Sequence, residues 1–389
     1  MNPMRFGDVL RNYKILSSLF RVMNHLCPLC SDTNSTVIYD CENLPLFQNV
    51  VFSSQAEAAD TIKVNIELRE CHNCGFVWNS LFNEELMVYD ENYQNEQGLS
   101  VSFDVHLNDV VRLIAEKGYK SKKIVEIGCG KGLFLAKLKQ AGFTNVMGFD
   151  PAYEGDVEDI VPAYFCENSM IDNADLIILR HVLEHIARPA DFLQMITRNN
   201  RFHGEIYIEV PDFRWILNHG AFWDIYNEHC NYFTTETLSS LFGQSESHSL
   251  FHGQYIGLLA PLKGLRTPNV RCHKPLHAGE QNGLHARKSK YIDQLELLNN
   301  RTVVLWGASS KGVIWSNLLD PNRKHIHFLV DINPKKQGKF IGGTGHAIYG
   351  PDYLKQCDRK QLIIFVVNEN YFDEIQGMIN DSVVEMTCL

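Results

Sequence analysis

A glycine-rich stretch at residues 124–138 constrains the fold of this chain more than any other feature. Ile124-Val125-Glu126-Ile127 is a short, mostly apolar run, and it is followed by Gly128, Gly130 and Gly132 and by an apolar pattern over 133–138. The pattern predicts a buried strand, a tight turn and an amphipathic helix. This is the first unit of a doubly wound α/β domain, and its glycines let a ligand approach the backbone where a Cβ would block it.

A carboxylate after the next predicted strand indicates which ligand the turn holds. Residues 145–149 form that strand, and Asp150-Pro151 follow it. A carboxylate at this position can accept hydrogen bonds from both hydroxyls of a ribose. The order therefore predicts a nucleoside-binding site, with an ordinary glycine-rich turn as the alternative. The spacing Glu126-x-Gly128-x-Gly130-x-Gly132 resembles the first motif of class I S-adenosylmethionine-dependent methyltransferases.

Composition excludes several classes of protein. A chain of 389 residues predicts two or three domains, and 45% hydrophobic with 21% charged residues is ordinary for a soluble protein. The formal charge of −10 argues against a nucleic-acid partner. Because the sequence has no apolar run of about eighteen residues and no cleavable leader pattern, we expect a cytoplasmic protein without membrane contact. Residues 1–23 predict a short amphipathic helix that packs on a neighbouring domain, with membrane contact as the alternative.

Two CxxC pairs predict a metal site. Cys27-x-x-Cys30 and Cys71-x-x-Cys74 each allow a tight knuckle with two thiolates on one side. Two such knuckles complete a tetrahedral zinc site, whose closed coordination makes it structural and not catalytic. Predicted strands at 37–39 and 62–66 lie between the knuckles, and buried thiols without metal are the alternative reading.

Polar and aromatic residues follow the later strands of the predicted donor domain. His181 and His185 come after a strand at 174–179, where the loop should border the bound nucleoside. Their helical spacing also raises the possibility of a metal pair, although packing or donor contact is favoured because a third ligand is missing nearby. A strand at 205–212 and an aromatic segment at 222–233 come next. Within this segment, a carboxylate beside an imidazole can abstract a proton from carbon, but a packed aromatic loop is equally consistent.

The remaining segments complete the domain plan. Residues 82–100 are polar and contain tyrosines, which predicts either a linker or a substrate-facing segment. Helices are expected at 103–117 and 238–242, and residues 261–300 are predicted to be a linker that carries a helix near 291–298. A second α/β unit follows, with strands at 302–306, 327–331 and 362–367 and a helix at 313–319 whose amino terminus can hold an anion.

Taken together, these pieces resemble the sugar C-methyltransferase family, whose members methylate a ring carbon of nucleotide-linked keto-deoxysugars. The resemblance runs from Cys27 to the carboxyl-terminal half and depends on the cysteine knuckles, the donor motif and three further motifs: Tyr226-x-Glu228-His229, Gly307-Ala308-Ser309-x-Lys311-Gly312 and Asp331-x-Asn333-Pro334-x-x-Gln337-Gly338. It implies that His229 is the catalytic base and that a tyrosine upstream, here Tyr93, assists.

The expected fold is a doubly wound class I methyltransferase domain flanked by a small zinc-binding domain and a Rossmann-like α/β domain. Its predicted bounds are 24–80 for the zinc-binding domain, 81–260 for the methyltransferase domain, 261–300 for the linker and 301–389 for the Rossmann-like domain. The expected cofactors are S-adenosylmethionine and zinc. The donor-binding residues are predicted to be Glu126, Gly128, Gly130, Gly132, Asp150, Pro151 and His181.

The expected reaction is methyl transfer to a ring carbon, with C3 of a 4-keto-deoxysugar favoured. His229 removes a proton beside the ketone, Glu228 orients its imidazole, and Tyr226 donates to the oxyanion that develops. The chain departs from the family's usual pattern at 340–346, which affects substrate identity more than reaction type. The alternatives are an O- or N-methyltransferase and a non-catalytic zinc-knuckle binding protein. A monomer is favoured.

Overall fold

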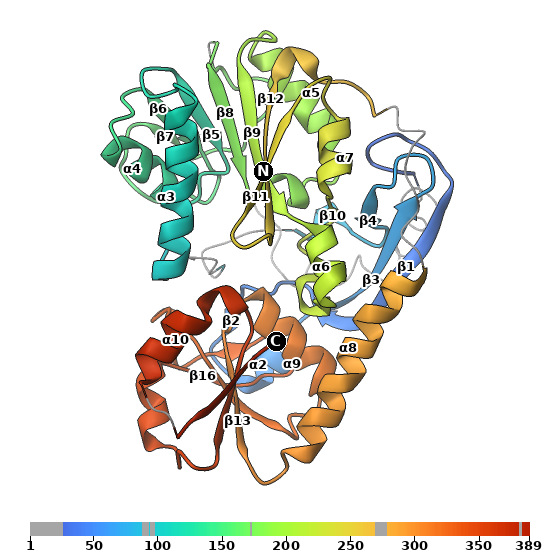
Figure 1. The fold of residues 1–389 in the computed structure, drawn as a ribbon, viewed down its shortest axis with the longest axis vertical. Coiled ribbons are helices and arrows are strands. Elements are labelled where there is room, and N and C mark those ends of the chain that lie inside the picture. Colours follow the sequence, from blue (N-terminus) through green and yellow to red (C-terminus); the bar gives the residue numbers. More distant parts are fainter. Residues whose placement is uncertain (1–25, 88–92, 94–97, 172, 269–277, 381–382) are drawn as a thin grey trace.

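The computed structural model describes residues 26–87, 93, 98–171, 173–268, 278–380 and 383–389. The amphipathic helix predicted for residues 1–23 lies outside these ranges, as do residues 88–92 and 94–97 of the polar segment 82–100. Two α/β layers lie one above the other in Figure 1, and a smaller β-rich part joins them along one side. Among the described residues, no helix is both long and apolar enough to cross a membrane.

The larger layer is built on a seven-stranded sheet in the order β11-β12-β9-β8-β5-β6-β7. The five strands from β7 to β9 run parallel, and β12 and β11 are antiparallel additions at one edge. The parallel strands are almost continuously apolar because helices cover both faces of the sheet. In chain order the strands are β5 (Ile124–Ile127), β6 (Val146–Phe149), β7 (Ile160–Val161), β8 (Leu176–Arg180), β9 (Glu205–Pro211), β11 (Glu246–Leu250) and β12 (Tyr255–Pro261).

Three helices of this layer overlap the ranges predicted at 103–117, 133–138 and 238–242, and two further helices, at 189–199 and 213–219, were not predicted. Helix α3 starts after Ser100, whose side chain accepts a hydrogen bond from the Phe103 N–H, and helix α7 starts with a capping box at Thr234. Such side chains satisfy N–H groups that have no partner within the helix. The helices are α3 (Val101–Glu116), α4 (Leu133–Gln140), α5 (Pro189–Asn199), α6 (Phe213–His219) and α7 (Thr235–Ser240).

The amino-terminal part is a four-stranded sheet in the order β1-β3-β4-β10. Its strands are β1 (Ser35–Pro45), β3 (Lys63–Cys71), β4 (Val77–Asn79) and β10 (Asn231–Tyr232). The first two contain the strands predicted between the cysteine knuckles. The fourth strand comes from the aromatic segment at 222–233, far away in the sequence. That segment is therefore held between the amino-terminal sheet and the larger α/β layer.

The carboxyl-terminal layer is a five-stranded parallel sheet in the order β16-β14-β13-β17-β18. Its strands are β13 (Thr302–Trp306), β14 (Ile326–Val330), β16 (Ile348–Tyr349), β17 (Leu362–Val366) and β18 (Glu385–Cys388), and its helices are α9 (Ser310–Leu319) and α10 (Phe372–Ile379). A short strand, β15 (Phe340–Ile341), leaves this layer and pairs with β2 (Val51–Phe52), which precedes α2 (Gln55–Ala59).

The segment predicted to be a linker contains a long helix. Helix α8 spans Ala278–Leu297, whereas the sequence predicted a helix only near 291–298. Leu284, Tyr291 and Leu295 are its buried residues, and α8 packs against α6 and β1. It runs along the side of the molecule from the larger layer to the carboxyl-terminal layer (Figure 1).

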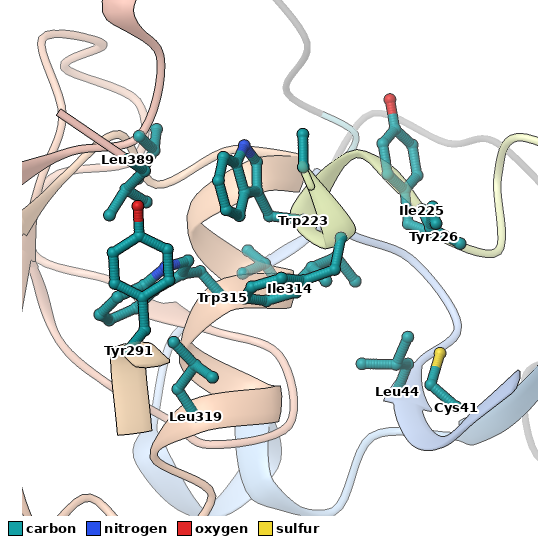
Figure 2. Close-up of a cluster of buried hydrophobic side chains, with 14 of the residues drawn as sticks. Cys41, Leu44, Trp223, Ile225, Tyr226, Tyr291, Ile314, Trp315, Leu319 and Leu389 are labelled. Carbon is teal, nitrogen blue, oxygen red and sulfur yellow. The ribbon is translucent and has the colours of Figure 1, made fainter. Parts of the chain in front are cut away.

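A shared apolar core joins the three parts. Figure 2 shows side chains from β1, the aromatic segment, α8 and α9 packed together, including Leu44, Trp223, Tyr291 and Trp315. Trp223 and Trp315 are each at most 2% exposed, and burying side chains of this size contributes much of the energy of a core. The backbone around Tyr226 is therefore anchored by residues from all three parts.

Candidate functional site

The glycine turn after β5 has the conformation that its sequence predicts. Gly128, Gly130 and Gly132 all have positive φ values, of 77°, 54° and 78°, which favour glycine. A Cβ on Gly128 would come within 2.3 Å of the Val182 side chain, whereas a Cβ on Gly130 would have no neighbour within 4 Å. Gly130 therefore faces open space, and a ligand can approach the backbone there.

Asp150 holds the same turn. Its carboxylate accepts hydrogen bonds from the Gly130 N–H at 2.7 Å and from the Ala152 N–H at 2.9 Å. Pro151, the next residue, is exposed. A carboxylate oxygen has two lone pairs, so Asp150 retains acceptor capacity for a ribose while it fixes the turn. Its contact with the donor remains a prediction.

Glu126 is a buried acid without a hydrogen-bond partner on one oxygen. Its side chain is on β5 and the residue is 2% exposed, and Oε2 has no partner among the described residues. Burial raises the pKa of Glu126 to about 8, although the nearby Arg180 guanidinium opposes the shift. A partly unsatisfied buried acid one residue before the glycine turn fits a group that receives a polar ligand.

The end of β9 carries a second buried acid, Glu209, which is fully paired. Arg180 donates to both of its oxygens at 3.1 Å, and His106 Nε2 lies 2.8 Å from Oε1. Burial would raise the pKa of Glu209, but Arg180 and the two neighbouring histidines, His106 and His181, hold it well below its usual value. This network of hydrogen bonds and ion pairs fixes the polar side chains that lie beneath the loop after β8.

His181 and His185 do not share a helix. His181 leaves β8 with φ of 53°, and His185 ends a 3-10 turn, η2 (Leu183–His185). Burial would lower the pKa of His181, but Glu184 and Glu209 raise it to about 9. Helical spacing therefore does not describe this loop, and contact of His181 with the donor remains a prediction. His185 instead faces His229, with ring centroids 4.8 Å apart.

The predicted catalytic residues meet behind this loop. The Tyr226 hydroxyl and His229 Nε2 are 2.7 Å apart, and the Tyr93 hydroxyl donates to Glu228 Oε2. The N–H of Gln48 also donates to Glu228, to Oε1 at 2.7 Å. The structure thus brings together Tyr93, Tyr226, Glu228 and His229. For residues 82–100, this position of Tyr93 favours the prediction of a substrate-facing segment over that of a linker.

Burial shifts the pKa values of Glu228 and His229 in opposite directions. Burial raises the pKa of Glu228, and the hydrogen bond from Tyr93 opposes this shift. Burial, followed by the neighbouring His185, lowers the pKa of His229 well below its usual value. His229 is therefore uncharged at neutral pH and has a lone pair that can accept a proton.

One expected contact is not made. Glu228 was expected to orient the imidazole of His229, but its carboxylate accepts from Tyr93 and Gln48 and, within the described part of the chain, has no hydrogen bond with His229. Instead, the backbone carbonyl of Glu228 accepts from His185 Nδ1 at 2.7 Å. The reason is that the turn after η3 (Phe222–Asp224) directs the two successive side chains to different neighbours.

A cleft between the two α/β layers connects these residues. It has a volume of about 730 Å³, its open mouth included, and it is lined by Asn49, Tyr93, His181, Glu184, His185, Pro211, Trp215, Ile216, Asp224, Tyr226, His229, Gln254, Tyr255, Ser310 and Lys311. Lys311, at the start of α9, forms an ion pair with Asp224. Lys311 lies just before the helix predicted at 313–319, whose amino terminus was expected to hold an anion. Asn49 and Glu184 were not predicted, and nothing local in the sequence marks Asn49.

The four cysteines of the two knuckles also meet. The Sγ atoms of Cys27 and Cys74 are 3.4 Å apart, and those of Cys30 and Cys71 are 3.5 Å apart. All four sulfur atoms lie within 4.8 Å of one another. A tetrahedral zinc ion with Zn–S bonds of about 2.3 Å requires sulfur atoms about 3.8 Å apart. The cluster therefore fits the predicted four-thiolate site, and it packs against the larger layer through Phe76 and Phe233.

Two family models match this chain. The first, described as a methyltransferase domain, matches residues 103–246, and the second, described as a C-methyltransferase C-terminal domain, matches residues 281–382. The chain is also similar to the C-methyltransferase NovU of Streptomyces niveus. The two are 22% identical over 365 residues, which cover 84% of this chain and 86% of NovU.

Two solved structures with similar folds each match less than half of this chain. The PH0226 protein of Pyrococcus horikoshii OT3 is 14% identical and has a TM-score of 0.35, with 45% of this chain and 99% of that chain covered. The magnesium protoporphyrin IX methyltransferase ChlM of Synechocystis PCC 6803, solved with bound S-adenosylhomocysteine, is 15% identical with a TM-score of 0.31, and 41% and 83% of the two chains are covered.

Proposed function

We propose that this protein, which belongs to the S-adenosylmethionine-dependent C-methyltransferases, methylates a ring carbon of a nucleotide-linked 4-keto-deoxysugar, with C3 as the favoured position. The pair of Tyr226 and His229 at the cleft, with Glu228 buried next to His229 in the chain, is the observation on which this proposal depends. The matched C-methyltransferase domain gives no support to the alternatives of O- or N-methyl transfer.

The chemistry requires a base, an oxygen-stabilising donor and an electrophilic methyl group. A ketone acidifies the hydrogen on its neighbouring carbon, so that removal of this proton gives an enolate whose carbon is the nucleophile. S-adenosylmethionine, when bound at the glycine turn, supplies the methyl group as an electrophile. Gly128, Gly130, Gly132 and Asp150 shape its site, and the unpaired oxygen of Glu126 is available to it.

His229 is the proposed base. Its imidazole is uncharged and lies at the cleft, and in the absence of substrate the Tyr226 hydroxyl lies 2.7 Å from Nε2. When the ketone enters, the Tyr226 hydroxyl donates to its oxygen and thereby frees Nε2 for the proton on carbon. The same hydroxyl stabilises the negative charge that develops on the oxygen. Glu228 and Tyr93 act as a hydrogen-bonded pair that supports the loop behind the base.

The carboxyl-terminal layer supports the nucleotide-linked part of the proposal. Ser310 and Lys311 begin α9 and line the cleft opposite the donor layer. A helix amino terminus next to a lysine favours an anion such as a phosphate. Lys311 is held by Asp224 and lies 5.6 Å from the centre of the Trp215 ring. The substrate would therefore lie between the two layers, with its ketone at Tyr226.

Zinc is proposed as a structural cofactor on Cys27, Cys30, Cys71 and Cys74. The sulfur distances fit a tetrahedral ion, and the knuckles pack in one apolar cluster with residues of the larger layer. A closed four-thiolate site holds a fold together and leaves no position for substrate. The cytoplasmic location and the monomeric state remain predictions.

Mass spectrometry tests the proposed function. The protein is incubated with methyl-labelled S-adenosylmethionine and a panel of nucleotide-linked keto-deoxysugars, and the position of the label is determined by fragmentation. We expect one labelled methyl group on carbon. A His229→Asn variant should lose both methyl transfer and solvent-deuterium exchange at that carbon, yet still bind the donor. A label on oxygen, or deuterium exchange at the wild-type rate in the variant, would contradict the proposal.

A further inference from the structure

Glu184, His185 and His229 form a second cluster of metal-ligating side chains, apart from the four cysteines. One ligand atom from each residue lies within 4.8 Å of the others. Glu184 and His185 belong to the loop after β8, and His229 belongs to the segment before β10, so that only the fold brings them together. All three line the cleft between the two α/β layers.

The carboxylate of Glu184 is buried without a hydrogen bond. The residue is 1% exposed, and neither of its two carboxylate oxygens has a hydrogen-bond partner among the described residues. His181 Nδ1 lies 3.5 Å from Oε1 and forms an ion pair with it. A buried carboxylate with no hydrogen bond costs several kcal/mol unless a cation compensates it. The protein therefore holds a buried carboxylate that lacks hydrogen bonds, with His181 as an ion-pair partner, beside the imidazoles of His185 and His229.

The ring of His185 is oriented for metal binding. A backbone carbonyl can only accept a hydrogen bond, so His185 Nδ1, 2.7 Å from the Glu228 carbonyl oxygen, must carry the proton. The lone pair of His185 is then on Nε2, on the other side of the ring. Metal-binding histidines usually have their second nitrogen fixed in this way by a carbonyl or a carboxylate. His229 lies against this ring, at an interplanar angle of 76°.

We infer that Glu184, His185 and His229 bind a divalent transition-metal ion, and that this ion reversibly inhibits methyl transfer. Two imidazoles and one carboxylate suit zinc, cobalt or nickel better than magnesium, which prefers oxygen ligands. Three protein ligands leave further coordination positions open to water. Because the ion occupies the imidazole of His229, that ring no longer accepts a proton from carbon. The inhibition of methyl transfer rests on the proposed function, whereas the binding of the metal ion does not.

Cobalt titration of the full chain tests the binding. The protein is purified with zinc in the cysteine site, and Co²⁺ is added in chelator-free buffer while absorption and binding heat are recorded. We expect one additional Co²⁺ per chain, with weak visible bands and without the intense thiolate-to-cobalt absorption that exchange at the cysteines would produce. Failure to bind an additional Co²⁺ ion would overturn the proposal, whatever the activity of the protein.

Matched variants locate the ion. Glu184→Gln and His185→Asn should each weaken Co²⁺ binding by at least tenfold, whereas His203→Asn, on an exposed turn, should leave it unchanged. Glu184→Gln keeps the size and shape of the side chain, and thermal unfolding checks that the variant is folded before the titration. If both variants bind Co²⁺ as tightly as the wild type, the site lies elsewhere and the proposal fails.

Activity assays separate this inference from the proposed function. With an accepted keto-sugar, Zn²⁺ or Co²⁺ should inhibit methyl transfer by wild type, and brief treatment with a chelator that leaves the cysteine zinc in place should restore it. Stimulation by the added ion would overturn the inhibition and the role of His229 as a free base. If every keto-sugar fails with and without metal, only the proposed substrate is contradicted, because the Co²⁺ titration measures binding independently.

Discussion

Removal of the Tyr93 hydroxyl tests whether the Tyr93–Glu228 hydrogen bond stabilises the site. Glu228 is fully buried, and Tyr93 and Gln48 donate to its two oxygens. A hydrogen bond to a charged group contributes roughly 1.5 to 3 kcal/mol, and the second contact of the Tyr93 hydroxyl, with Asn49 at 3.4 Å, is weak. We therefore expect Tyr93→Phe to lower the free energy of unfolding by about 2 kcal/mol at pH 7.

The pH dependence of this loss has a definite sign. Burial raises the folded-state pKa of Glu228 above its usual value of 4.5, so that this carboxyl favours the folded state below about pH 4.5 and destabilises it progressively as the pH rises. The Tyr93 hydroxyl opposes that effect by stabilising the carboxylate. Tyr93→Phe should therefore steepen the loss of stability with increasing pH. At pH 4 its cost should fall to that of a neutral hydrogen bond, about 1 kcal/mol.

A double-mutant cycle provides the assay. Tyr93→Phe, Glu228→Gln and the double variant are unfolded in urea and followed by tryptophan fluorescence, with Tyr164→Phe, an exposed tyrosine, as the control. We expect a coupling energy between Tyr93 and Glu228 of about 1 to 2 kcal/mol at pH 7. A coupling energy below about 0.5 kcal/mol would show that the hydroxyl does not support the carboxylate, and the role given to Tyr93 would be wrong.

Three further predictions concern the donor site and the cysteine cluster. Asp150→Ala should weaken S-adenosylmethionine binding by about 1 to 3 kcal/mol in calorimetry, because a hydrogen-bonded charge is lost; an unchanged Kd would assign the ribose to another residue. Cys27→Ser should abolish zinc in elemental analysis and lower Tm, and equal zinc content in variant and wild type would contradict the four-thiolate site. Because burial raises the pKa of Glu126 from 4.5 to about 8, wild type should lose stability relative to Glu126→Gln as pH rises through this range, by at most roughly 5 kcal/mol. Parallel urea-denaturation profiles from pH 4.5 to 8 would refute the last of these.

Elements that depend on local pattern were predictable from the sequence. The strands β5, β6, β8 and β13 are short apolar runs that end at glycine or at a polar residue, and each lies within two residues of its expected position. The turn at Gly128 required only its glycines. These predictions succeeded because the constraint and its signal lie in the same few residues.

Elements that depend on distant partners were not predictable. Leu284, Tyr291 and Leu295 have helical spacing in α8, but the glycine, histidine and lysine residues around them make the apolar pattern too weak to predict a helix of this length. The helix packs on α6 and β1, which are distant in the sequence. Gln48 donates to Glu228 across 180 positions of sequence. Within the site, the sequence therefore identified Tyr93, Tyr226, Glu228 and His229 as residues of interest, but not Gln48, whose N–H donates to Glu228.

The pairing of β2 with β15 determines when the site can first exist during synthesis. Gln48, which binds Glu228, lies just before β2, and β2 pairs with Phe340–Ile341 of the carboxyl-terminal layer. A ribosome releases the donor turn and all seven strands of the larger sheet long before it releases β15. A nascent chain can therefore hold its methyl donor while the loop beneath the carboxylate still lacks its partner strand. Catalytic competence therefore requires that the chain through β15 has been released.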